Sequence, residues 1–194
     1  MSKAALTRHM ILQNSFGLIY RKGYQATSID DILSTTPVTK GAFLYHFKNK
    51  DEMGLAMIRE IMSPGMRANL IHNLAGKKDA KKAIYEMMES LLYDTAFFDY
   101  RFGCPAVNLI DEMSPLNMDF NRALKEMMEE WQQSIAACIE NDAQLGKNDQ
   151  APNGMQVAYF VMSGYAGVRN MGKLYGLESY KTYLRELKKY LAAL

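Results

Sequence analysis

The sequence is poor in residues that cross-link a chain or bind metals. It holds two cysteines, Cys104 and Cys138, which lie far apart and form no Cys-x-x-Cys pair. Disulfide frameworks and zinc sites need more cysteines at closer spacing. The three histidines, His9, His46 and His72, fall on different predicted helices, with none at metal-ligand spacing from another. The sequence therefore predicts no metal, no cofactor and no disulfide.

Long apolar runs are also lacking. The longest uncharged stretch, 150–168, includes Pro152 and Asn153. It falls short of the roughly 20 mostly apolar residues that a membrane span needs. At the N-terminus, Thr7-Arg8-His9 interrupts any segment that could resemble a signal peptide. We therefore expect a cytoplasmic protein with no membrane partner.

No catalytic set is signalled either. Cys104 has no histidine paired with it in the pattern, and a free cysteine in a helical core is usually a small apolar residue. Asp30-Asp31 and Asp111-Glu112 are adjacent in sequence, so on a helix the two side chains of each pair point apart. These acids fit helix-end charges better than a shared-proton pair. The sequence favours a protein that is not an enzyme.

The sequence is rich in hydrophobic residues, and its charged residues are unevenly distributed along the chain. The 194 residues are 48% hydrophobic, enough to bury a core. Net charge is only +2, yet residues 1–62 hold 8 Lys and Arg against 5 Asp and Glu, and the remainder holds 15 against 16. The positive excess lies at the N-terminal end, where it would favour binding to phosphates.

The stretch 26–50 predicts two short helices joined by a tight turn. Thr27 or Ser28 is a good N-cap for the first helix, and Asp30 and Asp31 place negative charge in its first turn. Pro37 excludes the residue before it from helical conformation, so this helix should end near residue 35. Its apolar residues share one face: Ile29, Ile32 and Leu33.

The second helix of the pair should begin after Thr39, another N-cap candidate, with Phe43 and Phe47 as its apolar stripe. Its other side is small at the start, basic, and then aromatic: Lys40, Gly41, Ala42, Leu44, Tyr45 and His46. Such a face suits a helix that enters the DNA major groove by its N-terminus, where bulk would keep it out. The alternative is a surface helical hairpin with a solvated basic face.

This arrangement divides the predicted DNA contacts into two groups. Lys40, Tyr45 and His46 should face base edges. The side chains placed for phosphates are Thr27, Ser28, Lys48 and Lys50.

A wider pattern surrounds the helix pair. It begins with the run from Arg8 to Ile29, continues with Val38-Thr39-Lys40-Gly41-Ala42-Phe43, and ends with His46-Phe47-Lys48-Asn49-Lys50-Asp51-Glu52-Met53. As a set, these segments resemble the helix-turn-helix domain of the tetracycline-repressor (TetR) family of transcriptional regulators. Two positions depart from the family pattern: Pro37 stands where a glycine is usual, and Leu44 where a tyrosine is usual, with Tyr45 one place on.

The resemblance implies a fold and a function. It implies an all-helical homodimer whose N-terminal domains bind a palindromic operator in double-stranded DNA. It also implies that a small molecule bound in the C-terminal domain releases the DNA.

The rest of the chain is helical in period. A first helix should run over 3–22 and end at Gly23, with further helices over 51–62, 66–74, 79–97, 104–113, 120–139, 155–173 and 177–194. Ser63-Pro64-Gly65 should break or kink the chain, and 141–153 should be a mobile loop. The predicted fold is all-α: a three-helix helix-turn-helix DNA-binding domain over 1–50 and a helical ligand-binding and dimerisation domain over 51–194.

The second domain is rich in soft and aromatic residues, within a chain total of 15 Met, 12 Tyr and 8 Phe. A large core filled by adaptable methionines explains this richness, and so does a ligand cavity with a few polar groups on apolar walls. The predicted ligand-binding residues are Phe98, Phe102, Asn108, Trp131, Tyr159, Tyr165 and Arg169. Arg169 either favours an acidic ligand or pairs with a carboxylate such as that of Asp111.

Together these observations predict a ligand-responsive, DNA-binding transcriptional regulator, a repressor that a small molecule releases from its operator. The last two helices should form the dimer, through a small-residue patch and an apolar face: Ser163, Gly164, Ala166 and Gly167, and Tyr180, Tyr183, Leu184, Leu187, Tyr190 and Leu191. Two alternatives remain open at this point. One is a helical small-molecule-binding protein or enzyme without a DNA-binding role, and the other is a regulator whose C-terminal domain senses no ligand.

Overall fold

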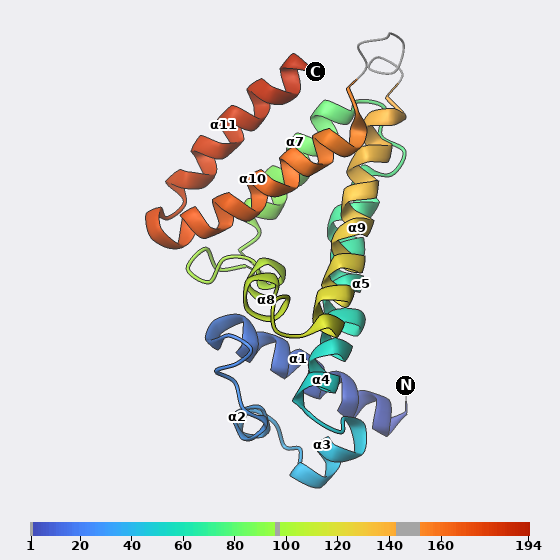
Figure 1. Cartoon of the computed structure of the whole chain (residues 1–194), viewed down its shortest axis with the longest axis vertical. Helices are drawn as coiled ribbons and strands as arrows, with labels where there is room; N and C mark the ends of the chain where they lie inside the picture. Colours follow the sequence, from blue (N-terminus) through green and yellow to red (C-terminus); the bar gives the residue numbers. More distant parts are fainter. Residues whose placement is uncertain (1, 96–97, 143–151) are drawn as a thin grey trace. The chain divides into compact units, whose positions relative to one another are not determined.

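The computed structural model describes residues 2–95, 98–142 and 152–194, and every regular element within these ranges is helical (Figure 1). The elements are α1 (Lys3–Lys22), α2 (Ile29–Ser34), α3 (Lys40–His46), α4 (Lys50–Met57), η1 (Ile58–Met62), α5 (Ser63–Met66), η2 (Arg67–Ile71), α6 (His72–Leu74), α7 (Ala80–Tyr93), α8 (Pro105–Met113), α9 (Met118–Glu140), α10 (Gly154–Tyr175) and α11 (Glu178–Ala193). The elements η1 and η2 are π-helical. The all-α prediction is confirmed.

Contacts within the chain gather into two compact units. The first holds Met1–Gly65 and Pro105–Glu126, and the second holds Met66–Cys104 and Met127–Leu194. The first unit therefore contains residues 51–65, α8 and the start of α9 in addition to the predicted DNA-binding domain over 1–50.

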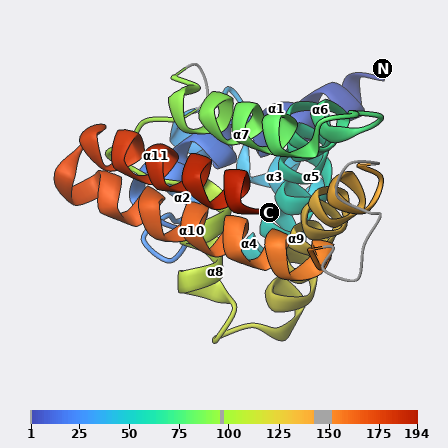
Figure 2. The same cartoon turned by 90° about the horizontal axis from the view of Figure 1, so that it is seen from above.

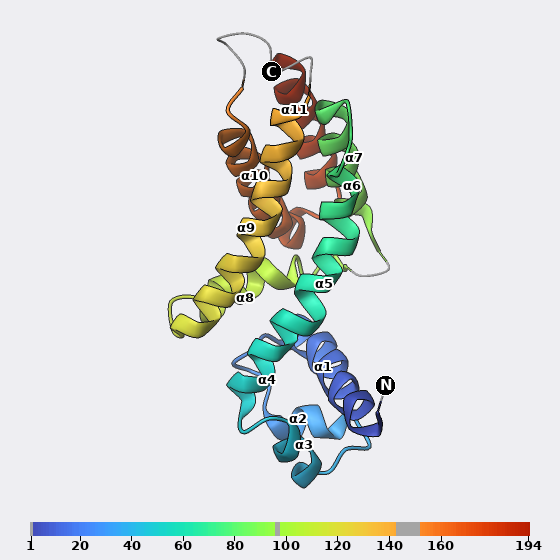
Figure 3. The same cartoon turned by 90° about the vertical axis from the view of Figure 1, so that its right-hand side faces the viewer.

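In the first unit, α1 contacts α2, α3 and α4 (Figure 3). The three short helices begin at side-chain caps, and those at Ser28 and Thr39 are among the predicted candidates. Ser28, Thr39 and Asn49 each accept a hydrogen bond from the backbone N–H three residues further on, at 3.0, 3.2 and 2.8 Å. Helices of six to eight residues are not stable alone in water, so caps and packing must supply their stability.

Aromatic side chains form much of the core of this unit. Phe43 of α3 and Phe47, the residue that caps its C-terminus, are buried with their ring centroids 5.6 Å apart. The Tyr24 ring meets the Phe120 ring edge-on at 4.9 Å. A Cβ at Gly54 would lie 2.6 Å from Phe120 and 2.8 Å from Tyr24, so α4 needs a glycine where these rings cross it.

The helical path continues from Lys50 to Leu74 through Pro64. Proline has no N–H to donate to the carbonyl four residues back, and its ring crowds that carbonyl. The turn before it is widened: the Ser63 N–H bonds to the carbonyl of Ile58, five residues back, and the Ser63 hydroxyl donates to the same oxygen at 3.0 Å. The predicted interruption is thus a π-helical turn rather than the end of a helix.

In the second unit, α11 packs against both α7 and α10, and the three lie side by side (Figure 2). Small residues of α10 admit the tyrosines of α11. A Cβ at Gly164 would lie 2.5 Å from the Tyr183 ring, and a Cβ at Gly172 would lie 2.6 Å from the Tyr180 ring. The close packing predicted from the glycines is therefore found at Gly164, but its partner is the same chain.

This packing corrects part of the predicted dimer surface. The apolar face of α11 is buried within its own unit, through Tyr180, Leu184, Leu187 and Leu191. It cannot also cover a partner. The predicted 79–97 helix also differs, since α7 ends at Tyr93 and Asp94 adopts a non-helical conformation; Phe97 lies outside the described residues, as does most of the predicted 141–153 loop.

Arg169 joins these three helices from the inside. Its side chain is 1% exposed, and it donates to the Leu91 carbonyl of α7 at 2.5 Å, to the Tyr165 hydroxyl at 3.0 Å and to the Tyr180 hydroxyl of α11 at 3.2 Å. These acceptors are a main-chain carbonyl and two phenol oxygens, not the carboxylate of Asp111 that the sequence suggested. The guanidinium therefore acts as a three-way link between helices.

Replacing this arginine tests the link. Arg169→Met keeps much of the side-chain volume but leaves a buried carbonyl and two buried phenols without their donor. We expect the free energy of unfolding to fall by about 1–3 kcal/mol. Urea denaturation at one fixed protein concentration measures it. The matched control is Arg185→Met on the exposed side of α11, which should stay within about 0.5 kcal/mol of the unmodified chain; equal losses in both variants would contradict the assignment.

Candidate functional site

Helix α3 presents two distinct faces. Phe43 and Phe47 are buried, and Arg8 covers the Phe47 ring with its guanidinium carbon 4.4 Å from the centroid. On the other side, Leu44 is 49% exposed and Tyr45 79% exposed. Large apolar and aromatic groups left in water at the end of a short, capped helix are typical of a recognition surface.

The start of α3 is open. Thr39, Lys40 and Gly41 are exposed, Ala42 is half-buried, and no heavy atom would lie within 4 Å of a Cβ at Gly41. The Lys40 ammonium lies 3.8 Å from the Asp30 carboxylate, with both side chains largely exposed. A pair of this kind is weak in water, so Lys40 is available to another anion.

The turn between α2 and α3 tolerates Pro37. No residue other than glycine has a positive φ in the described part of the chain, and the cap residue Thr35 has φ −94° and ψ 2°. The turn thus forms without the left-handed residue that a glycine would supply. Proline at this position fits the geometry that the chain adopts.

A reciprocal cap fixes the start of α2. The Asp31 carboxylate accepts from the Ser28 N–H at 2.8 Å and from the Ser28 hydroxyl at 2.6 Å, and Lys22 pairs with it at 2.9 Å. The hydrogen bonds from Ser28, followed by that from Lys22, hold the pKa of Asp31 well below its usual range. Ser28 is exposed at this helix N-terminus, where backbone N–H groups and the helix dipole favour a phosphate.

Two predicted phosphate contacts point inward instead. The Thr27 side chain is 0% exposed, and its hydroxyl donates to the Gly23 carbonyl at 2.7 Å. The Lys50 ammonium donates to the carbonyls of Tyr24 at 3.1 Å and Thr27 at 3.0 Å, and lies 4.6 Å from the Tyr24 ring centroid. Both residues hold the α1–α2 connection together, so neither suits the predicted role.

The remaining predicted contacts lie at the end of α3. His46 is half-buried, and its carbonyl accepts from Arg8 at 3.0 Å. Lys48 is exposed, while its backbone N–H donates to the Glu52 carboxylate at 2.8 Å. The backbone after α3 is therefore held by hydrogen bonds, and the Lys48 side chain is exposed to solvent.

One supporting residue gave no local signal in the sequence. The Glu112 carboxylate of α8 accepts from the backbone N–H of Tyr24 at 2.8 Å and of Gln25 at 2.6 Å. The Tyr24 hydroxyl in turn donates to Asp51 at 2.6 Å. Glu112 lies 88 residues from Tyr24 in sequence, so a reading of neighbouring residues could not pair them.

The predicted ligand residues are only partly assembled. The Trp131 and Tyr165 rings meet edge-on at 5.4 Å, and the Arg169 guanidinium carbon lies 4.8 Å from the Phe98 ring centroid and 5.2 Å from that of Tyr165. Burial raises the pKa of Tyr165 well above its ordinary value, so this phenol stays neutral beside the guanidinium. The buried indole N–H of Trp131 has no acceptor among the described residues.

The other three predicted ligand residues have surroundings of their own. Tyr159 is 69% exposed on α10. Asn108 belongs to the first unit, where it lines a small hollow with Phe16 and Tyr20. Phe102 lies in the turn before α8, with its ring centroid 5.7 Å from the Arg101 guanidinium carbon. The predicted set of seven therefore does not form one site.

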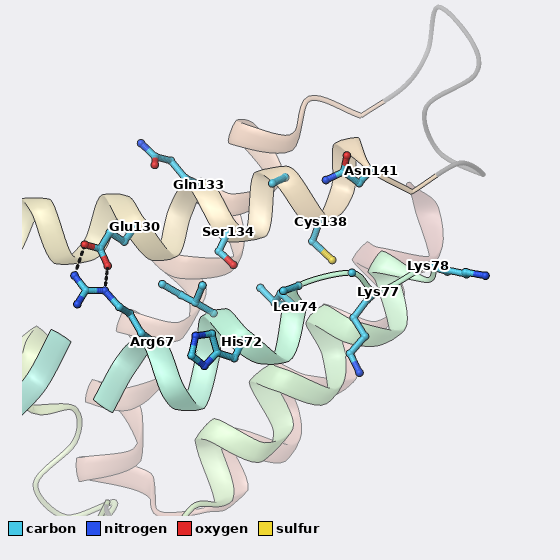
Figure 4. Close-up of a pocket in the computed structure, with 14 residues that line it drawn as sticks. Arg67, His72, Leu74, Lys77, Lys78, Glu130, Gln133, Ser134, Cys138 and Asn141 are labelled. Carbon is cyan, nitrogen blue, oxygen red and sulfur yellow. Dashed lines mark hydrogen bonds and ion pairs between the residues drawn. The ribbon is translucent and has the colours of Figure 1, made fainter. Parts of the chain in front are cut away.

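A large pocket lies elsewhere in the second unit (Figure 4). It has a volume of about 930 Å³ and is bounded by residues between 67 and 78 on one side and between 130 and 141 on the other. We call it the α6–α9 pocket. The sequence prediction missed it because its two sides are more than 50 residues apart and neither carries a recognisable motif.

Two kinds of site were sought in the described residues without success. No group of three or more His, Cys, Asp or Glu residues in those ranges is placed to hold a metal ion. Over the same ranges, each helix is too short or too polar to cross a bilayer.

Two family descriptions match the chain. Residues 11–57 match "Bacterial regulatory proteins, tetR family", and residues 61–187 match "Tetracyclin repressor-like, C-terminal domain". A transcriptional regulator of unknown role from Lactococcus lactis is 35% identical over 131 residues, which are 67% of this chain and 66% of that protein. Transcriptional regulator AcuR of Cereibacter sphaeroides is 29% identical over 177 residues, which are 88% of this chain and 78% of that one.

Solved structures share the fold. A TetR-family transcriptional regulator from Cytophaga hutchinsonii superposes with a TM-score of 0.86 at 19% identity, covering 100% of this chain and 97% of that one. At this identity the likeness concerns the fold alone.

The contrast between Lys48 and Lys50 can be tested by substitution. Lys50→Met removes the donor to two carbonyls, and we expect it to lower the free energy of unfolding by about 1–2 kcal/mol. Lys48→Ala should leave stability within about 0.5 kcal/mol, and should weaken binding to all duplex sequences alike. Thermal unfolding and fluorescence anisotropy with labelled duplexes measure the two effects. Equal loss of stability in both variants would contradict the structural role of Lys50.

Proposed function

This chain belongs to the TetR family of bacterial regulatory proteins, and from that premise we propose that it is a dimeric repressor that a small molecule releases from its operator. It is a DNA-binding transcriptional regulator. The repressor role, the dimer surface, the DNA contacts and the control by a ligand are the parts that we propose.

The observation that carries the proposal is the two-faced helix α3. Its buried face is fixed by Phe43 and Phe47, while Lys40, Leu44 and Tyr45 lie exposed on the other side. A basic group and an aromatic group on one exposed helix face can reach base edges in the major groove, and Leu44 can pack on a thymine methyl group. Phosphate contacts come from Ser28 and Lys48 on the flanks.

A surface of α10 supports a dimer. Large apolar side chains are exposed on it at intervals of about four residues, with small residues between them: Met155, Tyr159, Ser163, Gly167, Met171 and Tyr175. Leu174 beside them is 73% exposed. Rows at this spacing are the ridges by which two helices interlock, and Gly167 leaves room for close approach. We propose that α10 of a second copy covers this row.

Dimerisation would give the DNA contact its geometry. Two copies related by a two-fold axis present two α3 helices, and successive major grooves on one side of a duplex lie about 34 Å apart. A palindromic operator matches that symmetry.

DNA binding is tested with duplexes from the region upstream of the chain's own gene. Affinity should fall steeply with salt, because each neutralised phosphate releases counterions and contributes about −0.9 to the log–log slope. Selection from random duplexes should return a different preferred sequence for Tyr45→Ala than for the unmodified chain. Binding that ignores salt, or an unchanged selected sequence, would contradict the assigned surface.

The dimer surface is tested by adding charge to it. Leu174→Glu combined with Tyr159→Glu should convert the dimer to a monomer, because two buried carboxylates would face an apolar partner. Sedimentation velocity measures the change. The matched control is Leu116→Glu, which changes a leucine of the first unit that is 64% exposed, against 73% for Leu174, and this variant should remain dimeric. A dimer that persists in the double variant would exclude this surface.

A further inference from the structure

We propose that the α6–α9 pocket is the effector site, and that it takes a small molecule with an apolar body and one carboxylate. This inference rests on the proposed function, since it assigns a place and a chemical class to the effector. The pocket lies entirely within the second unit.

The first argument is space. At about 930 Å³, the α6–α9 pocket has the volume typical of small-molecule sites. The cluster around Arg169, by contrast, is closed: Trp131, Tyr165 and Arg169 are each at most 3% exposed and pack on one another. A ligand would have to displace that packing, whereas the α6–α9 pocket can accept one as it stands.

The second argument is the apolar lining. Ile71 and Leu74 come from one side, and Ala137 and Cys138 from the other. Figure 4 shows the Cys138 side chain directed from α9 toward Leu74, with the Ser134 hydroxyl directed from α9 toward α6. An apolar wall with a single hydroxyl suits the body of a ligand that carries few polar atoms of its own.

The third argument is the distribution of charge. At one end, Arg67 and Glu130 form a doubly hydrogen-bonded pair at 2.6 and 2.7 Å (Figure 4). The hydrogen bond from Arg67 lowers the pKa of Glu130, which keeps the pair ionised and its net charge zero. That end of the pocket therefore offers a ligand no net charge.

The opposite end of the pocket is lined by a lysine, Lys77. Gly76 has a φ of +70° and forms the turn before Lys77 and Lys78, both of which line the pocket (Figure 4). No carboxylate of the described residues lies within ion-pair distance of the Lys77 ammonium. His72 lines the same side of the pocket and lies between Arg67 and Lys77 (Figure 4). An anionic ligand group would find a partner at this end.

Two nearby acids, Asp79 and Asp142, form no ion pair with Lys77, although their charges, after the larger effect of burial, raise the pKa of the Cys138 thiol. The Asp79 carboxylate accepts from the Lys82 backbone N–H at 2.9 Å, and the buried Asp142 carboxylate accepts from the Ala80 backbone N–H at 2.8 Å. Both acids are therefore engaged at the start of α7, where the helix dipole offsets negative charge. Lys77 remains available for the ligand carboxylate.

The experiment is titration calorimetry on the full-length protein with defined probes. The probes are benzoate, phenylacetate, hexanoate and octanoate, each compared with its uncharged primary amide. We expect at least one carboxylate to bind about five- to tenfold more tightly than its amide, the difference that one charge-assisted hydrogen bond supplies. Lys77→Gln should remove that difference, and the control Lys81→Gln, on α7 outside the pocket, should retain it.

A second variant tests the location. Ala137→Trp fills the pocket from an exposed position on α9, so it should abolish binding of carboxylate and amide alike without lowering the unfolding temperature. The inference is overturned if no probe binds, if amides bind as tightly as carboxylates, or if both pocket variants bind like the unmodified chain.

DNA binding separates this inference from the proposed function. Anisotropy with operator duplex, with and without the bound carboxylate, should show weaker DNA binding in its presence by the same factor by which DNA weakens the carboxylate. A carboxylate that binds in the pocket without changing DNA affinity supports the pocket and overturns the proposed release. An absence of DNA binding in every condition overturns the proposed function and leaves the calorimetric result standing.

Discussion

The first unit depends on how the short connection between α1 and α2 is held. Helices α2 and α3 have six and seven residues, so their direction is set by what anchors the chain that enters them. Lys50 donates to two carbonyls of this connection, and Glu112 accepts from two of its N–H groups. A cation and an anion thus bind complementary backbone groups of the same few residues. Buried backbone groups without such partners would favour unfolding of the connection.

The polar side chains that bond within the first unit are not available to bind DNA. Since Thr27 and Lys50 serve the connection, the outward surface is left with Lys40, Tyr45 and Lys48. Part of the positive charge of the N-terminal part therefore stabilises the fold. Fewer basic side chains are available to DNA than the number of Lys and Arg residues there suggests. The Tyr45 ring meets the His46 ring edge-on at 5.0 Å, and the residue is still 79% exposed. Together with the exposed Leu44 beside it, this ring leaves an apolar surface open to a partner molecule.

The sequence allowed prediction of features that act over a few residues. The caps at Ser28, one of two candidates, and at Thr39, and the end of α1 at Gly23, depend on neighbouring residues alone, and all were predicted. Features that join distant segments were not. Glu112 contacts Tyr24 across 88 residues of sequence, and Arg169 contacts Leu91 across 78. Both contacts depend on how distant helices pack, which a short sequence pattern does not predict. Tyr159 was predicted to line a ligand site but is 69% exposed. Helical spacing shows which residues share a face, but it does not show which part of the molecule covers that face.

The second unit contains two polar arrangements with opposite properties, one closed and one open. Around Arg169 the donors and acceptors satisfy each other and join α7, α10 and α11. The α6–α9 pocket instead keeps open volume beside η2, a π-helical stretch whose hydrogen bonds are less regular than those of an α-helix. That stretch is covalently continuous, through Pro64, with the helix that begins at Lys50. A ligand that prefers one form of η2 can therefore bias the same helix whose first residue anchors the α1–α2 connection.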